Sequence, residues 1–278
     1  MKRWWAAALV GLCTVARAQS EIAFKSLDRH DGQAVELKAW WFAAPTKAPA
    51  PAVVLLHGCG GVYDRQGRIG ERMRHYAALL NGLGQHALVV DSLTPRGERE
   101  ICTQRTGTRA ITQSSRRLDA LAALQWLAQR PDVDARHLGL MGWSNGGSAV
   151  LSSTNLQHRA VVDFPVKPAF AVAFYAGCAA DLKRGYRPSA PLLMLVGEAD
   201  DWTPAAPCHE LASGLVGQGV EIEGYASAYH GFDSSAPVRL RPGVPNGVNP
   251  GAGVHVGGQA EAWRRSRERL LQFLQAQR

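Results

Sequence analysis

From residue 53 onward, short runs of Val and Leu alternate with longer amphipathic segments, and this alternation constrains the fold more than any other feature. The pattern is typical of an α/β protein with a mostly parallel central sheet and helices on both faces. The expected strands span residues 53–56, 87–90, 138–141, 171–175, 192–196 and 220–225. The expected helices span residues 69–83, 114–129, 145–153, 205–216 and 259–275.

The two ends of this pattern differ from its middle. Residues 22–42 alternate polar and apolar side chains, as an antiparallel pair at the N-terminal edge of the sheet would. Residues 234–258 are rich in Gly, Pro and Val without a clear period, so we expect a long surface loop there. Because no linker interrupts the alternation, and 46% of the 278 residues are hydrophobic, residues 19–278 are expected to form a single domain.

Residues 1–18 have the pattern of a secretory signal peptide, which is removed from the mature protein. Lys2 and Arg3 precede an apolar run over residues 4–15, and Ala16 and Ala18 are the small residues of a cleavage site. The run is too short to cross about 30 Å of hydrocarbon, so no stable membrane anchor is expected. The sequence therefore predicts an exported protein, either periplasmic or extracellular.

The formal net charge of +8 raises the question of nucleic-acid binding. Lys2, Arg3 and Arg17 belong to the predicted signal peptide and contribute part of this charge. The other basic residues are scattered and do not form one basic run with interleaved aromatic residues. A nucleic-acid partner is therefore not expected.

Export changes how the cysteines are interpreted. Cys13 leaves with the signal peptide, and Cys59, Cys102, Cys178 and Cys208 remain as an even set in a compartment that permits disulfides. Three pairings are possible. The placement of these cysteines in loops after neighbouring strands favours Cys59 with Cys102 and Cys178 with Cys208. No CxxC or HxxxH spacing supports a metal site, so none is predicted.

The motif GWSNGG at residues 142–147 follows an expected strand and opens an expected helix. This is the context in which a G-x-S-x-G motif forms a nucleophile elbow. Glycines on either side of Ser144 allow a tight, strained turn that presents the hydroxyl, and the helix N-terminus favours a developing negative charge. The motif predicts Ser144 as the nucleophile and the Asn145 N–H as an oxyanion donor. The alternative is a serine that only caps a helix.

An acid and a histidine follow the next expected strands in the order that the nucleophile requires. Asp200 and Asp201 come after the strand over 192–196, and His230 comes after the last strand. Ser, then acid, then His is the chain order of the α/β-hydrolases. His230 is the predicted general base, and Asp200 is the predicted acid that orients it. Asp201 and His255 stay open as alternatives.

The motif HGCGG at residues 57–61 follows the first central strand. A glycine-rich turn at this point lets a backbone N–H approach the substrate oxygen, and we expect this donor to come from Cys59 or Gly60. His57 is expected to hold the loop by hydrogen bonds.

Three further residues are candidates for substrate binding. Arg96 lies in the loop after the strand over 87–90, where its guanidinium could bind a substrate carboxylate or tie loops together. Trp143 and Trp202 flank the catalytic positions and are candidates for the pocket wall, although large aromatic residues at strand ends usually belong to the core.

With these motifs in place, the chain resembles the dienelactone hydrolase family of α/β-hydrolases over most of residues 35–276. The resemblance rests on HGCGG at 57–61, DSLTPRG at 91–97, GWSNGG at 142–147, GEADDWTP at 197–204 and YHGFD at 229–233. It implies an α/β-hydrolase fold, Asp200 as the acid, and Ser144 and His230 in the other two roles. The chain is also similar to exported members with cysteines near these motifs, which supports two disulfides.

One departure from the family limits what the resemblance implies about substrate. The founding members carry a cysteine nucleophile where this chain has Ser144, so their activity on dienelactones is not carried over. The resulting expectation is a secreted or periplasmic serine hydrolase that cleaves a small-molecule carboxylic ester or lactone through an acyl-enzyme, without a metal or organic cofactor. The alternatives are a peptidase or polyester hydrolase on the same scaffold and a non-catalytic binding protein.

Overall fold

The computed structural model describes residues 19–30 and 32–277. The predicted signal peptide, residues 1–18, lies outside the described residues. The strands of the main sheet are β1 (Gln19–His30), β2 (Gln33–Phe42), β3 (Ala50–Leu56), β4 (His86–Asp91), β5 (Val133–Trp143), β6 (Phe170–Phe174), β7 (Leu192–Gly197) and β8 (Val220–Tyr225). The helices are α1 (Glu71–Gly82), α2 (Gln113–Ala128), α3 (Asn145–Thr154), α4 (Arg159–Val162), α5 (Ala179–Arg184), α6 (Ala206–Ser213) and α7 (Ala260–Ala276).

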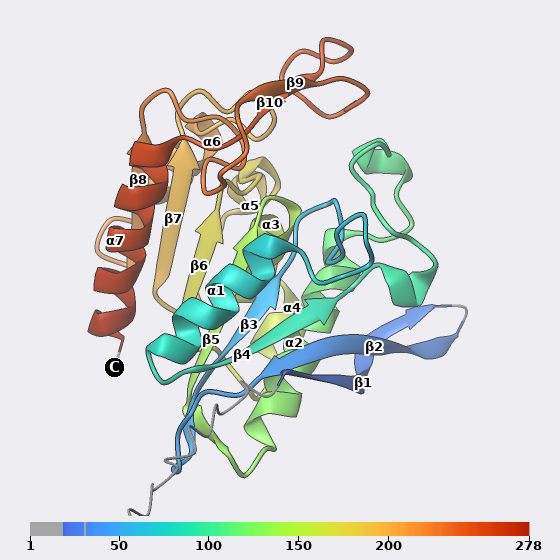
Figure 1. The fold of residues 1–278 in the computed structure, drawn as a ribbon, viewed down its shortest axis with the longest axis vertical. Coiled ribbons are helices and arrows are strands. Elements are labelled where there is room, and N and C mark those ends of the chain that lie inside the picture. The colour runs from blue at the N-terminus through green and yellow to red at the C-terminus, as the bar shows by residue number, and fades with distance from the viewer. Residues whose placement is uncertain (1–18, 31, 278) are drawn as a thin grey trace, which may run out of the picture.

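The eight strands form one sheet in the order β1-β2-β4-β3-β5-β6-β7-β8 (Figure 1). The pairs β1–β2 and β2–β4 are antiparallel, and the other neighbouring strands are parallel. This confirms the predicted sheet with its antiparallel N-terminal edge. Because β3 and β5 to β8 are parallel, the loops that follow them gather at one edge of the sheet.

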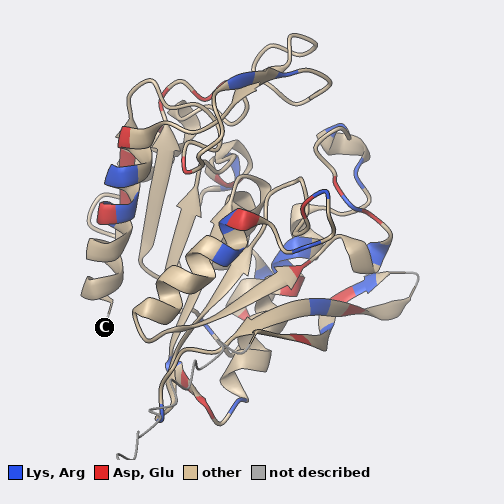
Figure 2. Ribbon diagram, viewed as in Figure 1, with Lys and Arg blue, Asp and Glu red and all other residues tan. Residues whose placement is uncertain are grey.

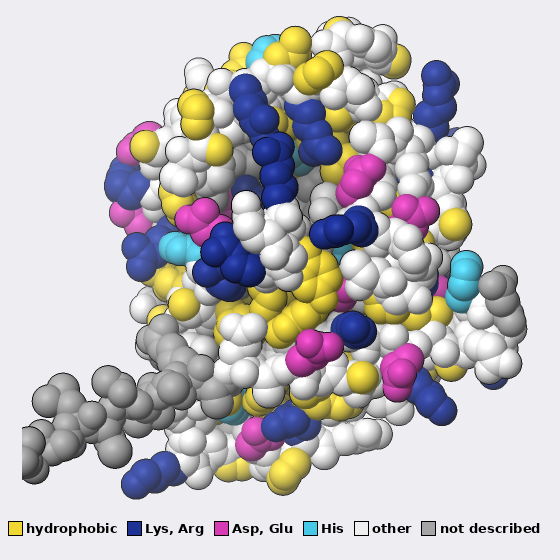
Figure 3. Space-filling model, turned by 45° about the vertical axis from the view of Figure 1, so that its right-hand side comes forward, with side chains coloured by type: hydrophobic (Ala, Val, Ile, Leu, Met, Phe, Trp, Pro, Cys, Tyr) yellow, Lys and Arg dark blue, Asp and Glu magenta, His cyan; other side chains and the backbone are white. Residues whose placement is uncertain are grey.

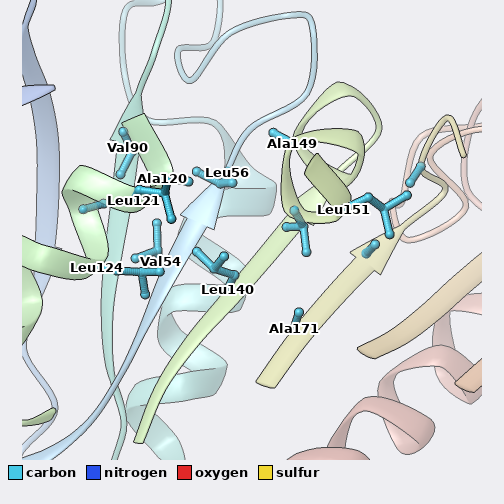
Figure 4. Close-up of a cluster of buried hydrophobic side chains, with 14 of the residues drawn as sticks. Val54, Leu56, Val90, Ala120, Leu121, Leu124, Leu140, Ala149, Leu151 and Ala171 are labelled. Carbon is cyan, nitrogen blue, oxygen red and sulfur yellow. The ribbon is translucent and has the colours of Figure 1, made fainter. Parts of the chain in front are cut away.

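Each face of the sheet packs against its own set of helices. On one face, Val54 and Leu140 lie in the same buried cluster as Leu121 and Leu124 of α2 and Ala149 of α3 (Figure 4). On the other face, side chains of α1 and α7 bury against the strands. Burial of one such large aliphatic side chain contributes about 1.5–3 kcal/mol, so the two clusters fix the strands that carry the loops of the site.

The helix ends follow from local sequence signals. α2 begins after Thr112, whose hydroxyl accepts a hydrogen bond from the Ser115 N–H, and it ends shortly before Pro131. α7 begins after Gln259, whose side chain accepts a hydrogen bond from the Ala262 N–H. Its outer surface carries both signs of charge (Figure 2), as expected for a solvent-exposed helix face.

The structure differs from the sequence prediction at several boundaries. α1 begins at Glu71 rather than at residue 69, because Ile69 pairs with Tyr63 in an isolated β-bridge. α6 ends at Ser213, since residues from Gly214 onward form turns. The segment over 234–258 is not only a loop, because it contains an antiparallel pair, β9 (Arg239–Arg241) and β10 (Val254–Val256). Strands of three residues are too short to leave a period in the sequence.

Both favoured disulfides are present. Cys59 is bonded to Cys102, and Cys178 is bonded to Cys208. The first joins the loop after β3 to the loop after β4, and the second joins the start of α5 to α6. Among the described helices, none combines the length and apolar character needed to cross a membrane.

Candidate active site

Ser144 occupies a strained turn between β5 and α3. Its backbone angles are φ 55° and ψ −120°, which few non-glycine residues adopt. The turn is closely packed, because a Cβ at Gly142 would lie 2.3 Å from the Gly146 carbonyl oxygen. A Cβ at Gly146 would lie 2.0 Å from the Leu56 carbonyl oxygen. The glycines of the motif therefore allow the close contact that presents the hydroxyl.

Three side chains from separate loops form one hydrogen-bond chain. Ser144 Oγ lies 2.8 Å from His230 Nε2, and His230 Nδ1 lies 2.7 Å from Asp200 Oδ2. With the imidazole proton on Nδ1, His230 donates to the carboxylate and its Nε2 accepts from the serine hydroxyl. Ser144 follows β5, Asp200 follows β7 and His230 follows β8, so the parallel strands bring them together.

The carboxylate of Asp200 is fixed by its own loop. Its side chain is fully buried, and Oδ1 accepts hydrogen bonds from the N–H groups of Trp202 and Thr203 at 2.8 and 2.9 Å. The Thr203 hydroxyl lies 2.9 Å from the Tyr175 carbonyl oxygen and 3.0 Å from Asp200 Oδ2. These contacts leave Asp200 Oδ2 aimed at His230.

The two alternatives from the sequence pair with each other instead. Asp201 Oδ2 lies 2.7 Å from His255 Nδ1, and Asp201 Oδ1 accepts the His255 N–H at 2.8 Å. His255 lies in β10, so this pair fastens the segment over 234–258 beside the site. The geometry therefore favours Asp200 and His230 over Asp201 and His255.

The loop after β3 is held against the elbow by Arg116 of α2. The Arg116 guanidinium donates to Asn145 Oδ1 at 2.6 Å and to the His57 carbonyl oxygen at 2.7 Å. It therefore ties together the two segments that carry the predicted oxyanion donors, Asn145 on one side and Cys59 with Gly60 on the other. Burial lowers the pKa of Arg116 to about 10, so the group stays charged at neutral pH.

His57 holds the same loop, as expected. Its Nδ1 donates to the Gly58 carbonyl oxygen at 2.7 Å, and its Nε2 accepts the Ser92 N–H at 3.3 Å. Burial, with the nearby charge of Arg116, lowers the pKa of His57 from 6.5 to about 3. The folded protein therefore holds this imidazole neutral.

This pKa predicts a dependence of stability on pH. Below pH 6.5 the unfolded chain binds a proton at His57 that the folded chain refuses until about pH 3, so stability is lost as pH falls through this window. The free energy of unfolding, measured with urea between pH 7 and pH 4, should fall more steeply for the wild type than for His57→Gln. If the free energy of unfolding fell equally with pH in the two proteins, the lowered pKa of His57 would be contradicted.

Arg96 does not reach the site, which corrects the expectation that it binds substrate. Its guanidinium donates to Asp119 at 2.8 and 2.9 Å and to Asp28 at 2.8 Å, and only 2% of its side chain is exposed. The 3₁₀ turn over Thr94–Arg96 directs the side chain toward β1 and α2. Arg96 therefore ties the loop after β4 to these elements.

We expect Arg96→Met to destabilise the protein by about 3–5 kcal/mol, because it leaves the buried Asp119 carboxylate without its cation. Urea unfolding measures this loss. The KM for anionic esters should stay at the wild-type value at temperatures where the variant is folded. A raised KM in a variant of normal stability would instead restore the substrate-binding role.

Asp233 is a buried carboxylate that the sequence analysis did not single out. Asp233 Oδ2 accepts from Tyr76 Oη at 2.9 Å and from Trp143 Nε1 at 3.0 Å. Asp233 Oδ1 accepts from Tyr175 Oη at 2.7 Å and from Arg72 Nε at 3.1 Å. Trp143 directly precedes the nucleophile and is almost completely buried. The hydrogen bond from Trp143 to Asp233 therefore fixes the residue next to Ser144.

Two cavities meet at Ser144, and they share Cys59, Ser144 and Trp202. The aromatic pocket has a volume of about 620 Å³ and is lined by Tyr63, Trp143, Tyr175, Trp202, Trp263 and the arginines Arg72, Arg239 and Arg241, among others. The α2–α5 pocket has a volume of about 590 Å³ and lies between α2, α3, α5 and the start of α6. Figure 3 shows basic side chains around a hollow with a hydrophobic floor.

The structure therefore brings together most of the residues singled out in the sequence. Trp202 lines both pockets, and its ring centroid lies 4.6 Å from that of the His230 ring at a tilt of 44°, whereas Trp143 lies mostly in the core. Sequence reasoning missed Arg116, Asp233 and Thr203. The motifs YHGFD and GEADDWTP already contain Asp233 and Thr203, but no local signal points to Arg116.

The strand order, the elbow after β5, and the serine, acid and histidine in the loops after β5, β7 and β8 are the features of the α/β-hydrolase class. Within this class, residues 39–277 match the model of the dienelactone hydrolase family. The chain belongs to the dienelactone hydrolase family, which is a family of hydrolases.

Individual relatives are distant. A candidate hydrolase of Bacillus subtilis strain 168, YtaP, is 29% identical over 120 residues, which cover 38% of this chain and 40% of that protein. The structure of a candidate dienelactone hydrolase from Klebsiella pneumoniae has a TM-score of 0.65 at 17% identity, covering 92% of this chain and 98% of that one. An acetyl xylan esterase from Paenibacillus sp. R4 has a TM-score of 0.64 at 14% identity, covering 96% and 86%. These structures are similar in fold.

Proposed function

We propose that the protein is a serine hydrolase that cleaves a carboxylic ester or a lactone by way of an acyl-enzyme. The observation that carries this proposal is the hydrogen-bond chain from Ser144 Oγ through His230 to Asp200. A histidine that accepts from the nucleophile and donates to a buried carboxylate is prepared for general base catalysis. Membership of a hydrolase family agrees with this chemistry.

In the first half-reaction, Ser144 Oγ attacks the ester carbonyl carbon and its proton passes to His230 Nε2. The carbonyl oxygen becomes an oxyanion, which accepts hydrogen bonds from the Asn145 N–H and from an N–H of Cys59 or Gly60. The bond to the leaving oxygen then breaks, and His230 returns its proton to the leaving alcohol. Asp200 stays ionised and stabilises the imidazolium.

In the second half-reaction, His230 takes a proton from a water molecule, which attacks the acyl carbon. The bond to Ser144 Oγ breaks, the serine regains its proton from His230, and the acid is released. These side chains and backbone groups supply every step, so the proposed mechanism uses neither a metal nor an organic cofactor.

We also propose that the protein acts after export, in the periplasm or outside the cell. Residues 1–18 carry the predicted signal peptide. The two disulfides support this location, because disulfides persist in oxidising compartments and are rare in the cytosol.

The proposal is tested by comparing turnover of p-nitrophenyl butyrate, of an aryl lactone such as dihydrocoumarin, and of an alanine p-nitroanilide. We expect hydrolysis of the ester and the lactone, with a much lower kcat/KM for the anilide. Comparable or faster cleavage of the anilide would indicate a peptidase. Absence of turnover for all three would contradict the proposed activity on esters and lactones.

A further inference from the structure

The α2–α5 pocket contains a buried cation that is hydrogen-bonded to no carboxylate of the described residues. Arg117 of α2 is only 9% exposed. Its guanidinium donates to Ser152 Oγ at 2.8 Å and to Ser114 Oγ at 3.2 Å, and both acceptors are neutral hydroxyls. Among the described residues, Arg117 Nε has no hydrogen-bond partner, and the two Nη groups donate to these two serines. Buried charges in proteins are usually paired, and each Nη group of Arg117 keeps a second hydrogen with which it can bind an anion.

The other side chains of this pocket do not neutralise Arg117. Arg109 and Arg184 line the same pocket, and Asp181 is its only acidic lining residue among the described ones. The Asp181 carboxylate accepts a hydrogen bond from Asn155 Nδ2 at 2.8 Å. The described lining of this pocket therefore contains three arginines and one aspartate.

The histidine of the pocket does not change this balance of charge. Burial, together with Arg117 and Arg184, lowers the pKa of His158 to about 4, so this residue is neutral at neutral pH. Burial also lowers the pKa of Arg117, and Asp181 opposes this shift only in part. Both shifts have the direction expected for basic groups that are buried beside other positive charges, with Asp181 too weak to offset them.

The position of this pocket relates it to the reaction. Ser144, Asn145 and Cys59 line it, and the same Ser144 and Cys59 line the aromatic pocket. A substrate whose scissile carbonyl lies at Ser144 can therefore extend in two directions. One is the aromatic pocket, where Arg72 is already paired with Asp233 and Arg239 and Arg241 also line the wall. The other is the α2–α5 pocket, which is lined by arginines and hydroxyls. A planar guanidinium matches a carboxylate in both charge and geometry.

We propose that the substrate is an ester with two different arms, of which the apolar arm occupies the aromatic pocket and the other carries a carboxylate that Arg117 binds in the α2–α5 pocket. This inference rests on the proposed esterase function and specifies its substrate class. Arg109 adds a second positive charge near the same carboxylate. Arg96, the arginine that the sequence suggested for this task, is already bound to Asp28 and Asp119.

The experiment compares p-nitrophenyl hemiglutarate with p-nitrophenyl valerate, which has an acyl chain of the same length without the carboxylate. We expect the wild type to have a kcat/KM for the hemiglutarate about tenfold or more above that for the valerate, through a lower KM. Arg117→Met should remove this preference, with a loss of kcat/KM on the hemiglutarate about tenfold larger than any loss on the valerate. An equal loss on both esters, or a wild type without the preference, would overturn the proposal.

Arg109→Gln is the second variant, because it changes a half-buried side chain and keeps Arg117 in place if Arg117→Met does not fold. It should weaken the same preference in the same direction. Arg136→Gln removes an equal charge from an exposed side chain near the opposite edge of the sheet, and it should leave the preference intact. Equal effects of Arg109→Gln and Arg136→Gln would show a general charge effect and overturn the proposal.

Binding to a Ser144→Ala protein separates the failure of this inference from the failure of the esterase proposal. Calorimetry with p-nitrophenyl hemiglutarate should show binding that a further Arg117→Met or Arg109→Gln change weakens about tenfold. Such binding in a protein whose wild type turns over neither ester would retain the carboxylate subsite and reject the esterase. Turnover of the valerate without arginine-dependent binding would reject the subsite and retain the esterase.

Discussion

Ser144→Ala is expected to lower kcat for esters by about a million-fold, because it removes the atom that forms the acyl-enzyme. Activity above the uncatalysed rate should remain, since the oxyanion donors and the binding pockets are unchanged. The folded structure should be retained, because alanine adopts the φ of 55° with about the same strain as serine. The measurement is kcat for p-nitrophenyl butyrate, with thermal unfolding as a check on the fold.

Ser213→Ala is the matched control. Its hydroxyl only donates to the Glu210 carbonyl oxygen near the end of α6, so the variant should keep the wild-type kcat. Equal kcat for Ser144→Ala and the wild type would refute the assignment of the nucleophile.

Asp200→Asn is expected to lower kcat by about ten thousand-fold with little change in KM. The amide NH₂ placed at Oδ2 can donate to His230 Nδ1, which moves the imidazole proton to Nε2. A protonated Nε2 cannot accept the proton of Ser144. The arrangement of the side chains should otherwise be retained, because the amide oxygen still accepts the N–H groups of Trp202 and Thr203.

Asp201→Asn provides the comparison, because Asp201 was the other candidate for the acid. Its carboxylate binds His255, so the change should loosen the segment over 234–258 and affect KM more than kcat. A larger loss of kcat in Asp201→Asn than in Asp200→Asn would reverse the assignment.

The sequence was sufficient for the parts of the fold that local patterns determine. β7 and the second half of β5 are apolar runs, and β8 alternates Val and Ile with Glu, so each strand leaves a recognisable pattern. Because these strands are parallel, the loops that carry Ser144, Asp200 and His230 lie at the same edge of the sheet. The elbow was recognisable because its motif follows one strand and opens a helix, and because Gly142 is required by a contact with Gly146 in the same turn. The cysteine pairing followed from the same strand order.

The rest of the site depends on contacts between distant residues. Arg116 is 59 positions from the His57 carbonyl that it binds, and Trp143 is 90 positions from Asp233. Arg96 was misplaced for the same reason, because its partner Asp28 lies 68 positions away on β1. A propensity or a motif describes only the residue's own neighbourhood, whereas these partners are chosen by the packing of whole elements.

Reaction with a fluorophosphonate at neutral pH, followed by mass spectrometry of the intact protein and its peptides, tests the central claim most directly. The aligned hydroxyl, imidazole and carboxylate predict one adduct per chain, on the peptide that contains Ser144, and no adduct in Ser144→Ala. An unmodified wild-type protein, or an adduct on any other residue, would contradict the account of Ser144 as an activated nucleophile.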